Sequence, residues 1–233
     1  MKAFLLAAGV GSRLRPVTDT IPKCMVTFDD RPLLDIWLDA FDRAGVTEVL
    51  VNLHHLPHVV REHVASRTGS PAVRLVFEPE LLGSAGTLLA NRDWVASEGS
   101  FLVCNADNLT DFDLRLLVEA HAGHDAIATL TVFHSDRPWT GGVVETDGAG
   151  RVTGFTEKPA EPVSDLVNAG MYAFRPRVLD EIDGALPRDI GFDLLPRLVG
   201  RAYAVLVDGY FRDIGTVDAY QRAGQEWPVR AGR

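Results

Sequence analysis

The sequence predicts an α/β fold: a Rossmann-like, mixed but mainly parallel sheet flanked by helices. Three observations support this prediction. First, 46% of the 233 residues are hydrophobic, which is enough to bury a sizeable core in one domain. Second, strand patterns alternate with helical patterns over residues 2–132. Third, the first apolar run leads directly into a glycine-rich turn, as expected of a central parallel strand.

The first half of the chain alternates between the two patterns. Continuous apolar runs predict buried strands, and apolar residues spaced three or four apart predict helices. The predicted strands are 2–8, 48–52, 73–77, 101–104 and 126–132. The predicted helices are 32–44, a segment that starts at Pro57, 85–94 and 114–122. Ligands of such sheets bind at the carboxyl ends of the strands, so the residues after the first and fourth strands are the first site candidates.

The second half is richer in strands. Asp147-Gly148 is a strong turn signal between two strand patterns and predicts a hairpin. The predicted strands are 141–146, 151–156, 167–174, 202–207 and 209–213, and the predicted helices are 191–199 and 216–226. The chain contains no linker, low-complexity tract or internal repeat, so we expect a single domain.

Composition and charge argue against several classes of protein. The net charge of −9 and the lack of a lysine-rich patch argue against a nucleic-acid partner. No apolar run approaches the roughly 20 residues that cross a membrane, so we expect no membrane contact. The apolar start of the chain is followed at once by Arg13 and Arg15. We interpret it as a strand rather than an export signal, which predicts a cytoplasmic location.

The cysteines and histidines have simple interpretations. Cys24 and Cys104 are far apart in sequence, a pattern that indicates neither a disulfide framework nor a zinc site. We expect two buried thiols in a reducing compartment. Four histidines crowd residues 54–63, but Pro57 interrupts any shared helical face, so we expect surface or loop histidines rather than metal ligands.

The strongest chemical signal is the glycine turn after the first strand, together with Lys23. Gly9 and Gly11 allow backbone N–H groups to approach phosphate oxygens closely. Arg13 adds paired donors, and Lys23 adds a point charge for the outer phosphates. Leu14 stands where a dinucleotide fingerprint requires a third glycine, and the spacing of a P-loop is absent. The segment predicts a different kind of phosphate-binding loop.

Six ordered motifs resemble those of sugar-1-phosphate nucleotidyltransferases, and the resemblance extends over nearly the whole chain. The glycine turn is similar to the signature G-x-G-x-R-L-x-P-x-T…P-K-x-M, with matches at Gly9, Gly11, Arg13, Leu14, Pro16, Thr18, Pro22, Lys23 and Met25. The other five motifs are 82–86 (similar to L-G-T-A-G), 105–109 (G-D-x-L, with Ala106 for glycine), 155–159 (F-x-E-K-P), 167–172 (N-x-G-x-Y) and 210–216 (W-x-D-I-G-T, with Phe211 for tryptophan).

The resemblance implies a nucleotide-diphospho-sugar transferase fold within the single domain 1–233. Residues 1–135 would bind the nucleotide, and residues 136–233 would form a small strand-rich extension that binds the sugar phosphate. The implied nucleotide site comprises Leu6, Ala7, Ala8, Gly9, Gly11, Ser12, Arg13, Lys23, Glu80, Gly83, Gly86 and Asp107. The implied cofactor is Mg²⁺, held by Asp107 and Asp213, since magnesium prefers one or two carboxylates plus phosphate oxygens.

The resemblance also implies the sugar-phosphate site. Lys158 would hold the phosphate of the sugar and Glu157 a sugar hydroxyl, and Gly142, Asn168 and Gly170 would line the pocket. The implied catalytic residues are Arg13, Lys23, Asp107 and Lys158.

The implied reaction is transfer of a nucleotidyl group from a nucleoside triphosphate to a sugar 1-phosphate, with release of pyrophosphate. Segment 82–86 favours GTP with a mannose- or heptose-type sugar. UTP with a muramate- or hexose-type sugar is the close alternative, and cytidylyl, thymidylyl and adenylyl transfer stay open.

Three expectations concern the protein as a whole. The chain stops soon after Asp213, without the C-terminal β-helix of full-length mannose enzymes, which favours the short members of the family. A homodimer is compatible with the sequence. From other classes, a nucleotide-sugar-dependent glycosyltransferase and a non-catalytic nucleotide-sugar-binding protein stay open as alternatives.

Overall fold

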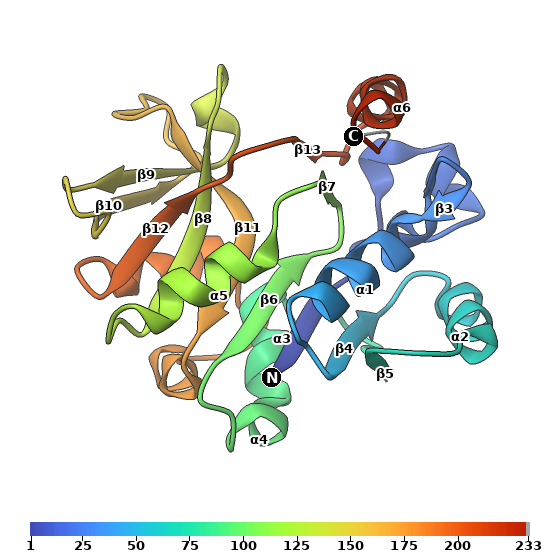
Figure 1. Cartoon of the computed structure of the whole chain (residues 1–233), viewed down its shortest axis with the longest axis horizontal. Helices are drawn as coiled ribbons and strands as arrows, with labels where there is room; N and C mark the ends of the chain where they lie inside the picture. Colours follow the sequence, from blue (N-terminus) through green and yellow to red (C-terminus); the bar gives the residue numbers. More distant parts are fainter. Residues whose placement is uncertain (232–233) are drawn as a thin grey trace. The chain divides into compact units, whose positions relative to one another are not determined.

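The computed structural model describes residues 1–231 and divides into two compact units. The glycine-loop unit is assembled from Ala3–Leu81, Cys104–Leu114 and the chain from Asp208 onward. The hairpin unit is assembled from Met1–Lys2, Leu82–Val103 and Arg115–Val207. Each unit therefore combines segments that are far apart in the sequence, as the colours of Figure 1 show.

The glycine-loop unit contains three neighbouring strands, β1 (Lys2–Leu6), β4 (Glu48–Leu53) and β5 (Ala72–Phe77). β4 and β5 pair in parallel from Glu48–Ala72 to Leu53–Phe77. The helices are α1 (Leu33–Arg43), α2 (Pro57–Ser66) and α6 (Val217–Ala231). The apolar stripe of α1 is almost fully buried at Leu33, Leu34, Trp37, Leu38 and Phe41. Its burial positions the strand ends that carry the candidate residues.

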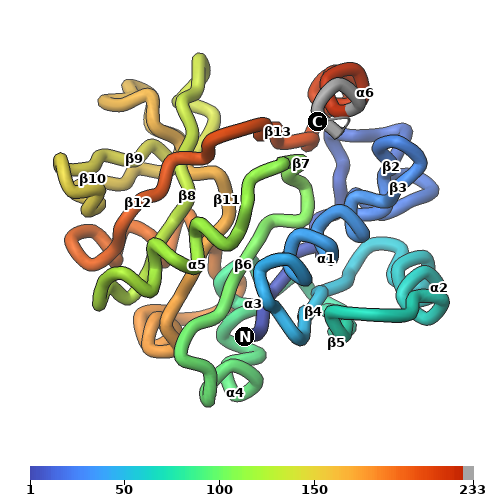
Figure 2. Tube along the Cα trace, viewed as in Figure 1, coloured from blue at the N-terminus to red at the C-terminus, as the bar shows by residue number. Residues whose placement is uncertain are grey.

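Short elements complete this unit. Three 3-10 helices follow β1, at Ser12–Leu14, Val17–Asp19 and Lys23–Met25, and β2 (Thr27–Phe28) pairs with β3 (Arg31–Pro32). β7 (Asn108–Thr110) pairs antiparallel with β13 (Phe211–Asp213), and Figure 2 shows these two segments side by side. This pairing brings the segment after β6 against a segment about a hundred residues later in the chain.

The hairpin unit is built around β8 (Ala128–His134) and β11 (Leu166–Phe174), which pair antiparallel. β12 (Ala202–Leu206) pairs parallel with β8, and the hairpin of β9 (Gly142–Thr146) and β10 (Val152–Glu157) joins β11 at Val143. β6 (Phe101–Asn105) begins in this unit. The remaining elements are α3 (Ser84–Ala90), α4 (Arg92–Val95), α5 (Leu114–Ala122), the 3-10 helices Pro138–Thr140, Pro176–Glu181 and Leu195–Leu198, and a π-helical turn at Ile190–Leu194.

The predicted mixed sheet with flanking helices and the predicted hairpin at Asp147-Gly148 are confirmed. Two predicted helices are each broken in two. The 85–94 segment breaks at Asn91, whose side-chain amide donates to the Thr87 carbonyl at 2.9 Å. The 191–199 segment becomes a π-helical turn followed by a 3-10 helix that contains Pro196, because proline has no N–H for a continuous ladder.

Two further expectations can be compared with the described residues. Cys24 and Cys104 are free and buried, as predicted, and burial raises the pKa of the Cys24 thiol to about 12. Within residues 1–231 no helix combines the length and apolar character that a membrane-spanning helix needs.

Candidate active site

The conformation of the loop after β1 is fixed by a hydrogen bond between Thr18 and Gly11. Gly11 has a φ of 69°, in the left-handed region that favours glycine. Thr18 is 1% exposed and donates its hydroxyl to the Gly11 carbonyl at 2.7 Å. His55 Nε2 lies 2.8 Å from the Thr18 carbonyl, within hydrogen-bond distance, and helps to fix the position of Thr18. The loop therefore has a defined shape, while Gly9 and Ser12 stay exposed.

Lys23 and Asp107 form the central ion pair of the glycine-loop unit. Lys23 Nζ donates to Asp107 Oδ2 at 2.9 Å, with 12% and 32% of the two side chains exposed. Asp107 follows β6, and its neighbour Ala106 donates its backbone N–H to the Leu6 carbonyl at 3.0 Å. The carboxyl ends of β1 and β6 thus bring the loop lysine and the acid together, as the sequence predicts.

Asp213 lies beside this pair. The Ile214 N–H donates to the Asp107 carbonyl at 2.9 Å, which places β13 against the segment that carries Asp107. Asp213 is exposed, and its Oδ1 accepts the Gly215 N–H at 2.6 Å. Desolvation by neighbouring protein atoms and the negative charge of Asp107 raise the pKa of Asp213, against the lowering effects of Lys23, the Gly215 N–H and Arg13.

Arg13 approaches the same carboxyl group. A Cβ at position 215 would lie 3.0 Å from Arg13 Nη2 and 2.7 Å from Asp213 Oδ1, so glycine leaves room for both side chains. Arg13, Lys23, Asp107 and Asp213 therefore form one cluster of two cations and two carboxylates, and the predicted convergence holds within this unit.

The two carboxylates fit a Mg²⁺ ion. No group of three or more acidic, histidine or cysteine ligands occurs among the described residues, so a complete protein cage is absent there. Magnesium binds through one or two carboxylates when substrate phosphates and water supply the other oxygens. Burial and the negative charge of Asp107 raise the pKa of Asp213, and a bound cation would favour the ionised form of both carboxylates.

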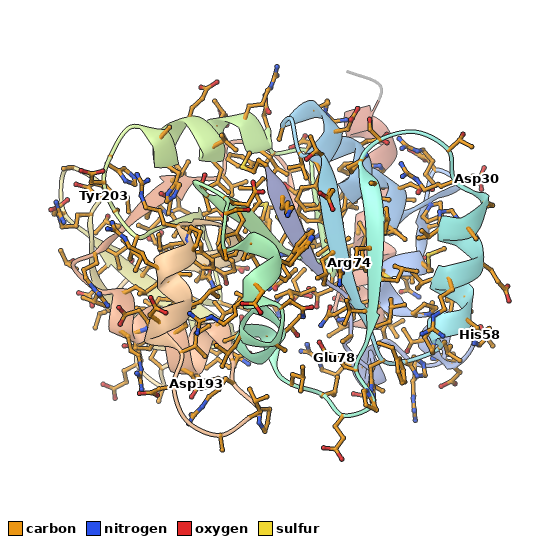
Figure 3. The ribbon with its side chains drawn as sticks, turned by 90° about the horizontal axis from the view of Figure 1, so that it is seen from below. Asp30, His58, Arg74, Glu78, Asp193 and Tyr203 are labelled. Carbon is orange, nitrogen blue, oxygen red and sulfur yellow. The ribbon has the colours of Figure 1, made fainter. Side chains whose placement is uncertain are left out.

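The sequence did not point to a buried polar chain at the ends of β4 and β5. Asn52 Oδ1 accepts the Ala7 N–H at 2.7 Å, and Asn52 Nδ2 donates to Glu78 Oε1 at 2.9 Å. Asn52 and Glu78 are only 4% and 3% exposed. Figure 3 shows Glu78 at the end of β5. Ala7 belongs to the predicted nucleotide-binding segment. The hydrogen bonds from Ala7 through Asn52 to Glu78 therefore fix the backbone that would face the base.

The remaining nucleotide residues are placed differently. Glu80 is exposed in the loop after β5. Gly83 and Gly86 belong to the hairpin unit, where both have an internal packing function. A Cβ on Gly83 would collide with the backbone of Arg188, and a Cβ on Gly86 would lie 2.8 Å from Leu186 Cδ2.

This packing joins segment 82–86 to segment 188–192. The Arg188 carbonyl accepts the N–H groups of Ala85 and Gly86 at 3.0 and 3.1 Å. Ser84 Oγ donates to Asp189 Oδ2 at 2.8 Å and accepts the Ile190 N–H at 2.7 Å. The sequence prediction missed Ser84 and Asp189 in this role, because their partners are a hundred residues apart.

Glu157 and the other predicted sugar-phosphate residues all lie in the hairpin unit. Glycines at 142 and 191 leave space for the Glu157 carboxylate, since a Cβ there would lie 2.7 and 2.5 Å from Oε2. Burial raises the pKa of Glu157, the Lys158 ammonium opposes the shift, and the charge of Asp189 raises the pKa further. The carboxylate of Glu157 is therefore confined at the end of β10, and burial and neighbouring charges alter its pKa.

Lys158 is held in an unusual conformation. Its φ is 49°, a left-handed value that costs a non-glycine residue roughly 1 kcal/mol. Its Nζ lies 3.9 Å from Glu157 Oε1 and 5.7 Å from the centre of the Phe192 ring. Phe192 is 59% exposed, so an apolar ring stands open beside the predicted phosphate-binding cation. An aromatic in a short helical segment gave no signal of this role in the sequence.

Asn168 and Gly170 form a distortion in β11. The pairing of β11 with β8 shifts register between Asn168 and Tyr172. Asn168 Oδ1 accepts the Gly170 N–H at 3.1 Å, and Asn168 Nδ2 donates to the Tyr172 hydroxyl at 2.7 Å. Gly170 has a φ of 71°, which explains why glycine is required there.

Comparisons with known proteins identify the family of this chain. The model of the family described as "Nucleotidyl transferase" matches residues 2–228 of the chain. The chain belongs to the nucleotidyl transferase family.

Family relatives differ in the substrates that their names give. The Drosophila melanogaster mannose-1-phosphate guanylyltransferase catalytic subunit beta is 36% identical over 219 residues, covering 92% of this chain and 59% of the relative. The Synechocystis UTP–glucose-1-phosphate uridylyltransferase is 35% identical, covering 96% and 62%. The chain thus spans about three-fifths of the length of the curated relatives that it matches.

A solved structure with the family fold extends the comparison. HddC from Yersinia pseudotuberculosis superposes with a TM-score of 0.80 at 22% identity, and the match covers 97% of this chain and 99% of HddC. The likeness confirms the nucleotidyl transferase fold over nearly the whole length of this family member.

The two loop glycines allow a test that separates folding from ligand binding. Gly11→Ala should destabilise the protein by about 1–2 kcal/mol, because a left-handed alanine is strained and its Cβ would meet Thr18 Cγ2 at 2.8 Å. Gly9→Ala has open space and ordinary backbone geometry. It should melt normally in a thermal scan but raise the KM for the nucleotide. Gly99→Ala, also in open space, is the control for both measurements. Equal melting temperatures for the Gly11 and Gly99 variants would contradict the strain argument.

The raised pKa of Glu157 predicts a pH dependence of sugar-phosphate binding. An acid whose pKa is raised takes up its proton at a higher pH, and the protonated carboxyl is a poorer acceptor for a sugar hydroxyl. The KM for the sugar 1-phosphate should therefore rise as the pH falls. Asp189→Asn removes a charge that raises this pKa, so the rise should move to lower pH.

The matched control for this pH profile is Asp165→Asn, an exposed acid paired with His134 at 2.9 Å. Comparison among the three proteins cancels the ionisation of the substrate itself. An Asp189→Asn profile that coincides with those of the unaltered protein and the control would show that Glu157 does not set the pH dependence.

Proposed function

We propose that this chain catalyses the reaction of a nucleoside triphosphate with a sugar 1-phosphate to give a nucleotide sugar and pyrophosphate. The observation that carries the proposal is the cluster of Arg13, Lys23, Asp107 and Asp213 beside the glycine loop. It combines donors for a phosphate chain with two carboxylates that suit a divalent cation. Family membership and the names of the relatives support the same reaction class.

The proposed chemistry is an in-line displacement at the α-phosphorus. An oxygen of the sugar 1-phosphate forms a new P–O bond, and the bond to the β-phosphate oxygen breaks, so the electron pair leaves with pyrophosphate. The attacking oxygen is already anionic and no general base is needed. Catalysis then depends on bringing two anions together and on compensating the charge of the transition state.

The glycine-loop unit would bind the triphosphate. Backbone N–H groups of the loop, Arg13 and Lys23 would hold the outer phosphates, which become the leaving group. The Lys23–Asp107 ion pair keeps the ammonium beside the carboxylate before substrate arrives. Asp107 and Asp213 would hold Mg²⁺, which supplies charge compensation at the phosphates when it is bound.

The hairpin unit would bind the sugar 1-phosphate. Lys158 would hold its phosphate and Glu157 a hydroxyl, while Asn168 offers both a donor and an acceptor. Phe192 would place an apolar ring against the carbon face of the sugar, since carbohydrate rings present C–H groups on one side. Because the carboxylate of Glu157 is confined, it would accept a hydrogen bond only from a sugar hydroxyl with a suitable orientation.

For the substrates we propose GTP with a mannose- or heptose-type sugar 1-phosphate. The name of the Drosophila relative, a mannose-1-phosphate guanylyltransferase, supports this choice. The uridylyltransferase of Synechocystis, at nearly the same identity, supports the alternative of UTP with a hexose-type sugar. The free, buried cysteines support the cytoplasm as the location of the reaction.

The catalytic cluster can be tested by charge removal. Lys23→Ala and Asp107→Ala should each lower kcat by about 10²–10³-fold, because each removes a group that compensates transition-state charge. Thermal melting should change little. The control Arg74→Ala removes an exposed charge from β5. Radiolabelled pyrophosphate exchange into triphosphate is the decisive assay, since a glycosyltransferase or a nucleotide-sugar-binding protein does not support it. Unchanged exchange in either variant would remove that residue from the mechanism.

The substrates can be tested with five nucleoside triphosphates against several sugar 1-phosphates, read by pyrophosphate release. We expect the highest kcat/KM for GTP with a mannose- or heptose-type sugar. A preference for UTP would establish the alternative and overturn the guanylyl assignment, while leaving the reaction class intact. Loss of release without Mg²⁺, and its recovery on adding the ion, would test the cofactor in the same format.

A further inference from the structure

The hairpin unit has a cavity of about 570 Å³ at the opposite ends of the strands that carry the sugar-phosphate residues. Arg151 lies directly before β10, whereas Glu157 is the last residue of that strand. Arg177 lies after the end of β11, whereas Asn168 lies near its start. Figure 3 shows Tyr203, which lines this cavity, well apart from Asp193 of the π-helical turn. The cavity is therefore not part of the candidate sugar-phosphate site.

The acidic residues of this cavity already have cationic partners. Glu181 binds Arg201 through both of its oxygens, at 2.9 and 2.8 Å. Asp180 binds Arg92 at 2.8 Å. Asp125, which is exposed, lies 3.8 Å from Arg175. These pairs leave little negative charge to compensate any further cation at the cavity.

Two guanidinium groups at the cavity have no such compensation. Arg151 donates to the Gly200 carbonyl at 2.8 Å and to the Tyr203 hydroxyl at 2.9 Å, and Arg177 donates to the Asp125 carbonyl at 2.8 Å. Within the part of the chain that the structure describes, neither makes an ion pair with a carboxylate. Each guanidinium has five N–H donors, so several on each remain available to a ligand.

Aromatic stacking holds one of these cations in place. The rings of His124 and Tyr203 stack with centroids 4.1 Å apart at 18°, and the guanidinium of Arg151 lies 5.0 Å from the centre of the Tyr203 ring. A guanidinium fixed by stacking and two hydrogen bonds loses little conformational freedom when an anion binds.

We propose that this cavity binds a small phosphate-bearing metabolite as an effector of the enzyme. Both guanidinium groups line the cavity, and a guanidinium complements the charge and oxygen geometry of a phosphate monoester. The volume exceeds that of a phosphate alone and lies within the range of small-molecule sites. β10 and β11 connect this cavity to Glu157 and Asn168. A ligand that restrains Arg151 before β10 or Arg177 after β11 therefore acts on the sugar-phosphate residues through these strands.

The first test measures binding to the full chain by titration calorimetry with glucose 6-phosphate. This probe has no anomeric phosphate and cannot react as a sugar 1-phosphate. We expect saturable binding that weakens at least tenfold in the double variant Arg151→Gln/Arg177→Gln. The control Arg61→Gln/Arg74→Gln removes two exposed charges from α2 and β5 and should bind like the unaltered protein. Absence of binding, or equal binding by the Arg151/Arg177 variant, would overturn the proposal.

Two further arms test the ligand class and the effector role. Inorganic phosphate should bind more weakly than glucose 6-phosphate, and equal affinity would overturn the assignment to an organic phosphate. Glucose 6-phosphate should change the KM for the sugar 1-phosphate at least twofold in the unaltered protein and not in the Arg151/Arg177 variant. Binding that leaves this KM unchanged would overturn the effector role.

Folding and turnover of the variants can be checked separately. The double variant should keep its turnover without effector, since neither arginine belongs to the proposed catalytic machinery. Should it fail to fold, Arg177→Gln alone replaces it, because Arg177 makes only one hydrogen bond, to a backbone carbonyl. The calorimetry does not depend on turnover, so its result stands even if the proposed transferase activity fails.

Discussion

The ion pair between Lys23 and Asp107 is the interaction on which the candidate active site depends. An acidic protein that binds polyanions must collect its few cations where the phosphates lie, and each needs a compensating charge before substrate arrives. The 2.9 Å contact provides this compensation. Asp213 joins the same cluster, where burial and the negative charge of Asp107 raise its pKa. In the proposed function, a divalent cation would compensate the two carboxylates and leave the two cationic side chains for the phosphates.

Close backbone approach is the second constraint. Gly11 makes room for Thr18, Gly83 for the backbone of Arg188, and Gly142 for the carboxylate of Glu157. These glycines are therefore explained by contacts inside the protein. Gly9 is different, because nothing lies within 4 Å of the Cβ that it lacks. Its exposed backbone is available to a ligand. Gly9 and Gly11 therefore belong to one sequence motif, but the presence of glycine has a different physical reason at each position.

The sequence was sufficient for the fold class, for most strand positions and, from the strand ends, for bringing the glycine loop and Asp107 together. The place of Asp213 beside Asp107 came from the family resemblance. The sequence was not sufficient for Asn52, Glu78, Ser84, Asp189 and Phe192. Each of these acts through a partner distant in sequence, such as the Ala7 N–H for Asn52 or Lys158 for Phe192. Nothing local distinguishes a buried asparagine from a loop asparagine before the strands are brought together. The roles assigned to the candidate residues, and the division of roles between 1–135 and 136–233, stay predictions.

The pairing of β7 with β13 has a consequence for biosynthesis. One carboxylate of the cluster is translated in the middle of the chain, and the other follows only after the whole hairpin unit. On the ribosome, the early segments of the glycine-loop unit must wait for β13 to emerge before Asp213 can reach Asp107. The hairpin unit has no such delay at its centre, because β8, β9, β10 and β11 follow one another closely. A nascent chain can therefore fold one unit while the other still lacks its final strand, and the two carboxylates meet only after synthesis of β13.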